Sequence, residues 1–100
     1  MNKKDHQIVV FVADWCPHCT HMVDHVWTDA NVKRAMGLYH NSEPAVVTCT
    51  KPQNRYLVQE FDLDRYPTVV IIDENRMIKK RANNMGPEEL VEFLENFDES

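Results

Sequence analysis

Runs of apolar residues in this chain alternate between the patterns of strands and of helices. Residues 7–13 are apolar at nearly every position and rich in β-branched side chains, which predicts a central strand covered on both faces. Residues 45–50 have a similar composition and are predicted to form a second strand, parallel to the first. Residues 69–72 and the more polar residues 77–81 flank a turn at 73–76, a pattern that indicates an antiparallel hairpin with an edge strand.

A helix is predicted directly after the first strand, from Pro17 to about Val26. One side of this helix and of the turn that follows it is apolar and is expected to face the sheet; it consists of Cys19, Val23, Val26, Trp27 and Ala30. The opposite edge carries three histidines that are expected to be exposed, namely His18, His21 and His25.

Three more helical segments are predicted. Thr28 or Asp29 can cap a second helix that runs through Met36, and Gly37 is expected to close it in a left-handed conformation. The spacing of apolar residues over 56–61 suits a short amphipathic helix. The last helix starts at a proline and has two glutamates in its first turn. Its buried stripe is predicted to consist of Leu90, Val91, Phe93, Leu94 and Phe97.

The predicted order of elements is β-α-β-α-β-β-α, and residues 1–100 suit a single α/β domain. The formal net charge of -5 argues against binding to nucleic acid or to anionic membranes, because both require a basic surface. No apolar run is long enough to span a membrane, and residues 1–6 lead into a strand rather than into the apolar core of a signal peptide. We therefore expect a cytoplasmic protein that acts as a monomer.

The stretch Trp15-Cys16-Pro17-His18-Cys19 stands where the first strand gives way to the first helix. The free amides and the dipole of a helix start favour a thiolate, and a Cys-x-x-Cys pair can open and close one disulfide. Pro17 suits the first helical position, so Cys16 is expected to be the N-cap and the more solvent-facing sulfur. These positions indicate that Cys16 is the nucleophile and Cys19 the resolving thiol. A protonated His18 beside Cys16 would stabilise the thiolate.

Two other interpretations of these side chains are open. Cys16, Cys19, His21 and His25 can be written as the four ligands of a structural zinc site, although the proline and the strand-to-helix position favour redox chemistry. The domain could also be an adaptor or binding module in which redox chemistry plays no part. The third cysteine, Cys49, is expected to be a buried packing residue. Three cysteines cannot form a disulfide framework, which agrees with a reducing compartment.

The order of elements and two separated motifs resemble the thioredoxin superfamily over residues 7–97. The first motif is the stretch from Trp15 to Cys19. The second, EFDLDRYPT at residues 60–68, is similar to the helix end and cis-proline segment of thioredoxins and disulfide isomerases. The resemblance implies a thioredoxin-like fold, a mixed four-stranded sheet with helices on both faces. It also implies a cis peptide bond before Pro67, which would lie against the two cysteines of the first motif.

The resemblance further implies a thiol:disulfide oxidoreductase that reduces or isomerises protein disulfides through Cys16 and Cys19, with Pro17 and His18 as further active-site residues. The substrate backbone is expected to pair with Tyr66. The walls of its groove are expected to be Trp15, Pro17, Pro67, Met85 and Gly86. Protein disulfides and a recycling reductase or glutathione are the expected partners. No metal and no organic cofactor are expected, because the Cys16–Cys19 disulfide itself carries the electrons.

Three features depart from thioredoxins. The additional amino-terminal strand and helix of full thioredoxins are absent from this sequence, so the core is closer in size to that of glutaredoxin. The dipeptide Pro17-His18 resembles that of the oxidising DsbA-type proteins, which predicts a less reducing protein than thioredoxin. Val10 stands where thioredoxins have a buried acid, so a hydrocarbon replaces the group that would accept the proton of Cys19.

Overall fold

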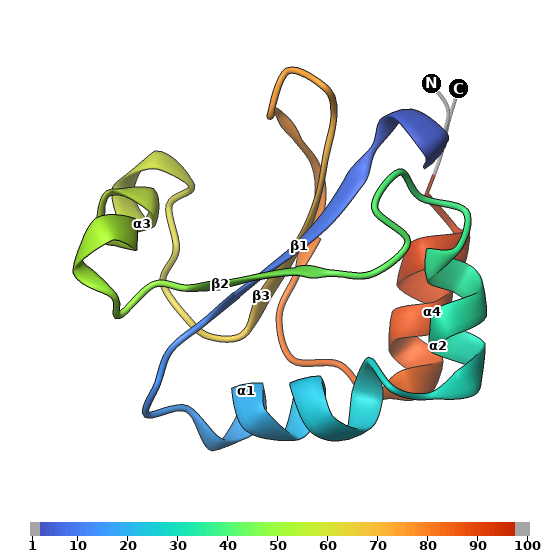
Figure 1. Cartoon of the computed structure of the whole chain (residues 1–100), viewed down its shortest axis with the longest axis horizontal. Helices are drawn as coiled ribbons and strands as arrows, with labels where there is room; N and C mark the ends of the chain where they lie inside the picture. Colours follow the sequence, from blue (N-terminus) through green and yellow to red (C-terminus); the bar gives the residue numbers. More distant parts are fainter. Residues whose placement is uncertain (1–2, 98–100) are drawn as a thin grey trace.

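A computed structural model describes residues 3–97 and shows a mixed four-stranded sheet with helices on both faces (Figure 1). The strands are β1 Gln7–Val12, β2 Ala45–Thr48, β3 Thr68–Ile72 and β4 Ile78–Ala82, in the spatial order β2-β1-β3-β4. β2 runs parallel to β1, whereas β3 is antiparallel to both β1 and β4. The predicted fold class, the parallel second strand and the hairpin are confirmed.

The helices are α1 Pro17–His21, α2 Ala30–Met36, α3 Tyr56–Glu60 and α4 Pro87–Glu95. α1 continues into a π-helical segment, η2 Met22–Val26, and there are short 3-10 turns at η1 Lys3–Asp5 and η3 Pro52–Asn54. Figure 1 shows α2 and α4 side by side, with α3 at the opposite end of the molecule. Within residues 3–97, no helix has the length and apolar character that a membrane span requires.

The alternation of side chains along β1 explains why its sequence is apolar on both faces. Ile8, Val10 and Val12 belong to a core cluster that also contains buried residues of α1, α2 and α4. Val9 and Phe11 belong to a second cluster, which contains residues from α3 and the segment after it. Both faces of β1 are therefore covered. The cysteine motif follows directly after this buried strand.

The π-helical segment changes which residues face the sheet. The N–H of Trp27 donates to the carbonyl of Met22 at 3.0 Å, a bond that spans five residues instead of four. Met22 is fully buried, although it is not part of the predicted stripe. The predicted inward position of Ala30 is wrong, since this residue is exposed. It opens the separate helix α2, which Asp29 caps by accepting the N–H of Asn31 at 2.9 Å.

The predicted left-handed closure of α2 at Gly37 is also wrong, because Gly37 has a φ of -60°. The chain continues in a right-handed turn in which the N–H of Tyr39 donates to the carbonyl of Met36 at 3.0 Å. Tyr39 is buried, and its hydroxyl donates to the carbonyl of Leu94 in α4 at 2.7 Å. This contact with α4 sets the direction of the chain after α2.

Candidate active site

Cys16 and Cys19 lie where β1 ends and α1 begins, as predicted. Cys16 has an extended backbone (φ -100°, ψ 106°) and is the N-cap of α1. Its sulfur accepts the N–H of Cys19 at 3.2 Å. Pro17 occupies the first turn, where no N–H is needed and its fixed φ suits the helix. The start of α1 therefore directs a backbone donor at the Cys16 sulfur, which stabilises negative charge there.

Both cysteines are buried, and Cys16, which was predicted to be the more solvent-facing one, is exposed to almost the same extent as Cys19. The exposed fraction is 4% for Cys16 and 3% for Cys19. A segment far along the chain lies against Cys16, whose thiol donates to the carbonyl of Tyr66 at 3.6 Å. The Tyr66–Pro67 peptide bond is cis, as the resemblance implies. Since both cysteines are free thiols of similar exposure, the difference between them lies in their hydrogen bonds and neighbours.

Cys19 is surrounded mainly by apolar side chains. Burial raises the pKa of its thiol to about 12; the other thiol of the motif adds to this shift, and a hydrogen bond with the backbone of Ala13 partly offsets it. Val10 is fully buried in the same cluster, so β1 presents a hydrocarbon at this face. Cys19 also lines an open cavity of about 230 Å³ together with Asp14 and Asp24. The charged residues of its lining are acidic, and Cys19 itself is only 3% exposed.

Trp15 and Tyr66 form a different wall of the site. Trp15 is 70% exposed, and its ring meets the ring of Tyr66 edge to face at a centroid distance of 6.0 Å. The two rings line a cavity of about 420 Å³ that also includes Cys49 and Arg55. Cys49 is buried, as predicted, and burial raises its pKa while a hydrogen bond with the Tyr66 side chain partly offsets the shift. Sequence reasoning missed this neighbourhood, because neither Cys49 nor Arg55 belongs to a motif.

Met85 and Gly86 complete the set of predicted groove residues. Met85 is buried in the same cluster as the two motif cysteines, and Gly86 is the N-cap of α4. Asn83 ties this loop to the cis-proline segment, because its Nδ2 donates to Thr68 Oγ1 at 3.1 Å and to the Pro67 carbonyl at 3.4 Å. An asparagine in a loop indicates only a turn, so this role of Asn83 could not be found in the sequence.

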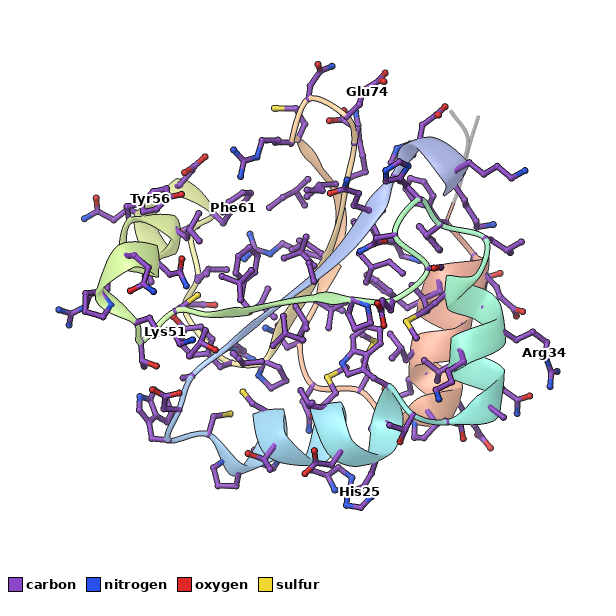
Figure 2. The ribbon with its side chains drawn as sticks, viewed as in Figure 1. His25, Arg34, Lys51, Tyr56, Phe61 and Glu74 are labelled. Atoms are coloured by element: carbon purple, nitrogen blue, oxygen red, sulfur yellow. The ribbon has the colours of Figure 1, made fainter. Side chains whose placement is uncertain are left out.

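The histidines of the first helix are exposed, as predicted. His18 stands on the first turn of α1, and the rings of His21 and His25 lie 5.1 Å apart between centroids. Figure 2 shows His25 pointing away from the sheet. Among residues 3–97, no group of three or more His, Cys, Asp or Glu side chains could hold a metal ion. The structure therefore does not bring together the four-ligand zinc set considered above.

Comparison with known proteins identifies a matching protein family. Residues 1–96 match the family model described as Thioredoxin. The chain is 31% identical over 80 residues to protein disulfide-isomerase A5 of Mus musculus, a match that covers 80% of this chain and 15% of that protein. It is 25% identical over 95 residues to DnaJ homolog subfamily C member 10 of Homo sapiens, which covers 95% of this chain and 11% of that protein. The chain thus spans only a small part of the length of these curated relatives.

Solved structures share the fold at lower identity. The C-terminal domain of Neisseria meningitidis DsbD in the oxidised form aligns with a TM-score of 0.77 at 18% identity, covering 94% of this chain and 81% of that chain. A thioredoxin from Thermus thermophilus aligns with a TM-score of 0.75 at 21% identity, covering 90% of this chain and 71% of that chain. These matches support the architecture, while the chemistry is argued from the geometry of the two cysteines.

Proposed function

The chain belongs to the thioredoxin family, and from this membership we propose that it is a thiol:disulfide oxidoreductase that reduces or isomerises protein disulfides. The observation that carries the proposal is the hydrogen bond of 3.2 Å from the Cys19 N–H to the Cys16 sulfur at the start of α1. The bond is made to the atom that must bear negative charge before it attacks a disulfide. A relative named protein disulfide-isomerase A5 supports the same class of reaction.

In the proposed reaction, the Cys16 thiolate attacks one sulfur of a substrate disulfide. A bond forms between Cys16 and that sulfur, the substrate S–S bond breaks, and the first substrate thiolate leaves. Cys19 then loses its proton and attacks the Cys16 sulfur. The Cys16–Cys19 disulfide forms and the second substrate thiolate leaves. Two electrons have passed to the substrate, whose two thiolates take up the protons released by Cys16 and Cys19; the reverse sequence oxidises a dithiol.

Deprotonation of Cys19 is the least favourable step of the proposed reaction. In the reduced protein, burial raises the pKa of Cys19 to about 12, and the side chain of Val10 cannot accept the proton. We place the path of the proton toward the cavity that Cys19 lines together with Asp14 and Asp24. Resolution of the mixed disulfide should therefore accelerate as the pH rises.

The substrate chain is proposed to lie beside the Tyr66–Pro67 segment, with its backbone paired to Tyr66. The exposed ring of Trp15 supplies an apolar surface on one side of Cys16. The remaining walls of the proposed groove are Pro17, Pro67, Met85 and Gly86. The link between Asn83 and Pro67 supports this arrangement, because it fixes the Met85–Gly86 loop relative to the cis-proline segment.

We extend the proposal to the compartment and the partners. Pro17-His18 and the helix start favour a thiolate on Cys16, which makes the pair less reducing than that of thioredoxin. In the reducing cytoplasm, the proposed location, the pair rests as the dithiol, so net reduction or isomerisation is favoured over net oxidation. A recycling reductase or glutathione would restore the dithiol. The reaction needs no organic cofactor, and one chain supplies the described groups of the site, so a monomer suffices.

The test combines an insulin-reduction assay with the redox potential of the Cys16–Cys19 pair in glutathione buffers. We expect catalysed reduction of insulin and a potential less negative than the thioredoxin value of about -270 mV. A Cys16→Ser/Cys19→Ser protein should be inactive. Wild-type protein that leaves insulin disulfides unreduced while its two thiols titrate as free would contradict the proposal. Full biological activity of the double variant would instead favour the adaptor function.

A further inference from the structure

The cavity between Trp15 and α3 lies next to the nucleophile. Trp15 precedes Cys16 in the chain, and Tyr66, the other aromatic residue of the lining, holds its carbonyl 3.6 Å from the Cys16 sulfur. The volume of about 420 Å³ falls within the range of ligand pockets. A substrate whose sulfur is bonded to Cys16 would therefore place a neighbouring side chain at the mouth of this cavity.

The lining combines aromatic surface with one cation. The residues that line the cavity are Trp15, Cys49, Thr50, Arg55, Val58, Gln59 and Tyr66. Arg55 is the only one of them that carries a formal charge at neutral pH, and it is exposed. Its guanidinium has no hydrogen-bond or ion-pair partner within residues 3–97. An arginine with free donors beside an aromatic wall is suited to bind a carboxylate in two-pronged fashion.

Two other cavities near the site have only acidic residues among their charged lining residues. The cavity beside Cys19 contains Asp14 and Asp24 and no basic side chain. A cavity of about 680 Å³ adjoins Gly86. Its charged lining residues are Asp29, Glu88, Glu89 and Glu95. Since the whole chain has a net charge of -5, an acidic group on a substrate meets repulsion over much of the surface and attraction at Arg55.

We propose that the cavity lined by Trp15 and Arg55 is a substrate subsite that receives an acidic side chain adjacent to the substrate cysteine, and that Arg55 selects it. This inference rests on the proposed thiol:disulfide exchange and names the class of disulfide that the site prefers. Arg55 acts as a specificity residue, because its guanidinium binds the substrate side chain and takes no part in the exchange of sulfur bonds. Its contribution should therefore appear in the association of substrate and in its dependence on salt.

The test uses short peptides in which one cysteine forms a disulfide with 2-thiopyridine, so that attack at the peptide sulfur releases a coloured thione. The peptides differ only in the neighbour of the cysteine, which is Glu, Gln or Lys, placed on either side. Each rate constant is divided by that for dithiothreitol, which removes the intrinsic effect of the neighbour on the disulfide. With wild-type protein at low salt we expect Glu to react about fivefold faster than Gln on one side of the cysteine, and Lys to react more slowly than Gln.

The variants are Arg55→Gln, which removes the charge, and Arg55→Glu, which reverses it. The matched control is Arg34→Gln, because Arg34 is an exposed arginine that projects from α2 at the opposite end of the molecule from α3 (Figure 2). We expect Arg55→Gln to bring the Glu/Gln ratio close to one, Arg55→Glu to invert the Lys/Glu order, and Arg34→Gln to keep the wild-type ratio. High salt should reduce the wild-type ratio.

The Glu/Gln ratio compares two peptides with the same protein. A variant that reacts more slowly with all peptides therefore still reports on the subsite. A Glu/Gln ratio of one in the wild-type protein, at either position and at low salt, would overturn the inference. A wild-type ratio that persists in Arg55→Gln would overturn the role of Arg55. Failure of the wild-type protein to release the thione from every peptide would overturn the proposed exchange itself, and the subsite with it, a pattern distinct from reaction without preference.

Discussion

Cys16 and Cys19 are almost equally buried, yet the structure surrounds them differently. The Cys16 sulfur accepts a helix N–H and contacts the Tyr66 carbonyl beside the cavity that Trp15 lines. Cys19 packs in the apolar cluster that contains Val10, and burial raises its pKa to about 12. The comparison teaches that exposure does not assign the two roles. Donors at the helix start favour charge on one sulfur, while apolar neighbours keep the other protonated until it must attack.

The largest effect is expected from Cys19→Ala. The nucleophile remains and the resolving thiol is absent, so the protein should accumulate mixed disulfides with substrate proteins and lose catalytic turnover. Mass spectrometry of the adducts would locate the bond at Cys16. The matched variant is Cys16→Ala, which should form no such adduct. If Cys19→Ala turns over substrate at the wild-type rate, or if its adducts form at Cys49, the assigned roles are wrong.

A second variant gives Cys19 a polar neighbour in place of an apolar one. Val10→Asp places a carboxylate on β1 at the face of Cys19, where it can accept the thiol proton. Resolution of a preformed mixed disulfide should become about tenfold faster near neutral pH and depend less on pH. The buried carboxylate should lower the free energy of unfolding by about 1–3 kcal/mol. Stopped-flow measurement of the decay at several pH values is the test.

Val10→Asn is the control for this experiment, because it buries a polar group of similar size that cannot accept the proton. It should destabilise the protein to a similar extent and leave the resolution rate unchanged. Equal decay rates in Val10→Asp and Val10→Asn, with both proteins folded, would show that position 10 does not face the resolving thiol.

A smaller effect is expected from His18→Gln. His18 is exposed on the first turn of α1. We expect that an imidazolium at this position would favour a thiolate on Cys16. Its removal should make the Cys16–Cys19 pair more reducing by about 30 mV or less, which corresponds to about 1.4 kcal/mol at most. His25→Gln, which removes an exposed imidazole farther along the helix, should leave the potential unchanged. Equal potentials for all three proteins would assign the effect to the helix start alone.

A further effect concerns stability at alkaline pH. The folded-state pKa of Cys19, about 12, lies above its ordinary value, so the folded reduced protein binds this proton more tightly than the unfolded chain does. The contribution is complete below the ordinary pKa and is lost as the pH rises toward 12. Burial also raises the pKa of Cys49 and of Tyr66, which gives the same sign. Urea unfolding of the reduced protein should therefore show a free energy that falls above pH 9, with a shallower slope in Cys19→Ala.

Local pattern was sufficient to predict the elements and the place of the cysteine motif. The apolar run over 7–13, rich in β-branched residues, predicted a strand covered on both faces, and Pro17 marked the helix start that makes Cys16 an N-cap. The burial of Cys16 could not be predicted, because it depends on Tyr66, fifty residues away in the chain. The end of α2 was predicted correctly, but the left-handed conformation of Gly37 was mispredicted for a similar reason: a tertiary contact, not local preference, directs the chain there.

The neighbourhood of the site was harder to predict than its centre. Asn83 and Arg55 carry no motif, and only the fold brings one to the Pro67 carbonyl and the other into the cavity beside Trp15. Met22 faces the core because η2 is π-helical. The spacing of apolar residues in the sequence gives no signal for such a turn. Sequence pattern thus locates reacting atoms well and locates the groups around them poorly.

The most direct test of the central claim is alkylation of the fully reduced protein with limiting iodoacetamide, followed by peptide mapping, over a series of pH values. Hydrogen bonding at the helix start should make Cys16 react first at mildly acidic pH, although it is as buried as Cys19. Cys19 and Cys49, whose pKa values are raised by burial, should react only at alkaline pH. Labelling of Cys19 or Cys49 before Cys16 at acidic pH would contradict the assignment of Cys16 as the nucleophile.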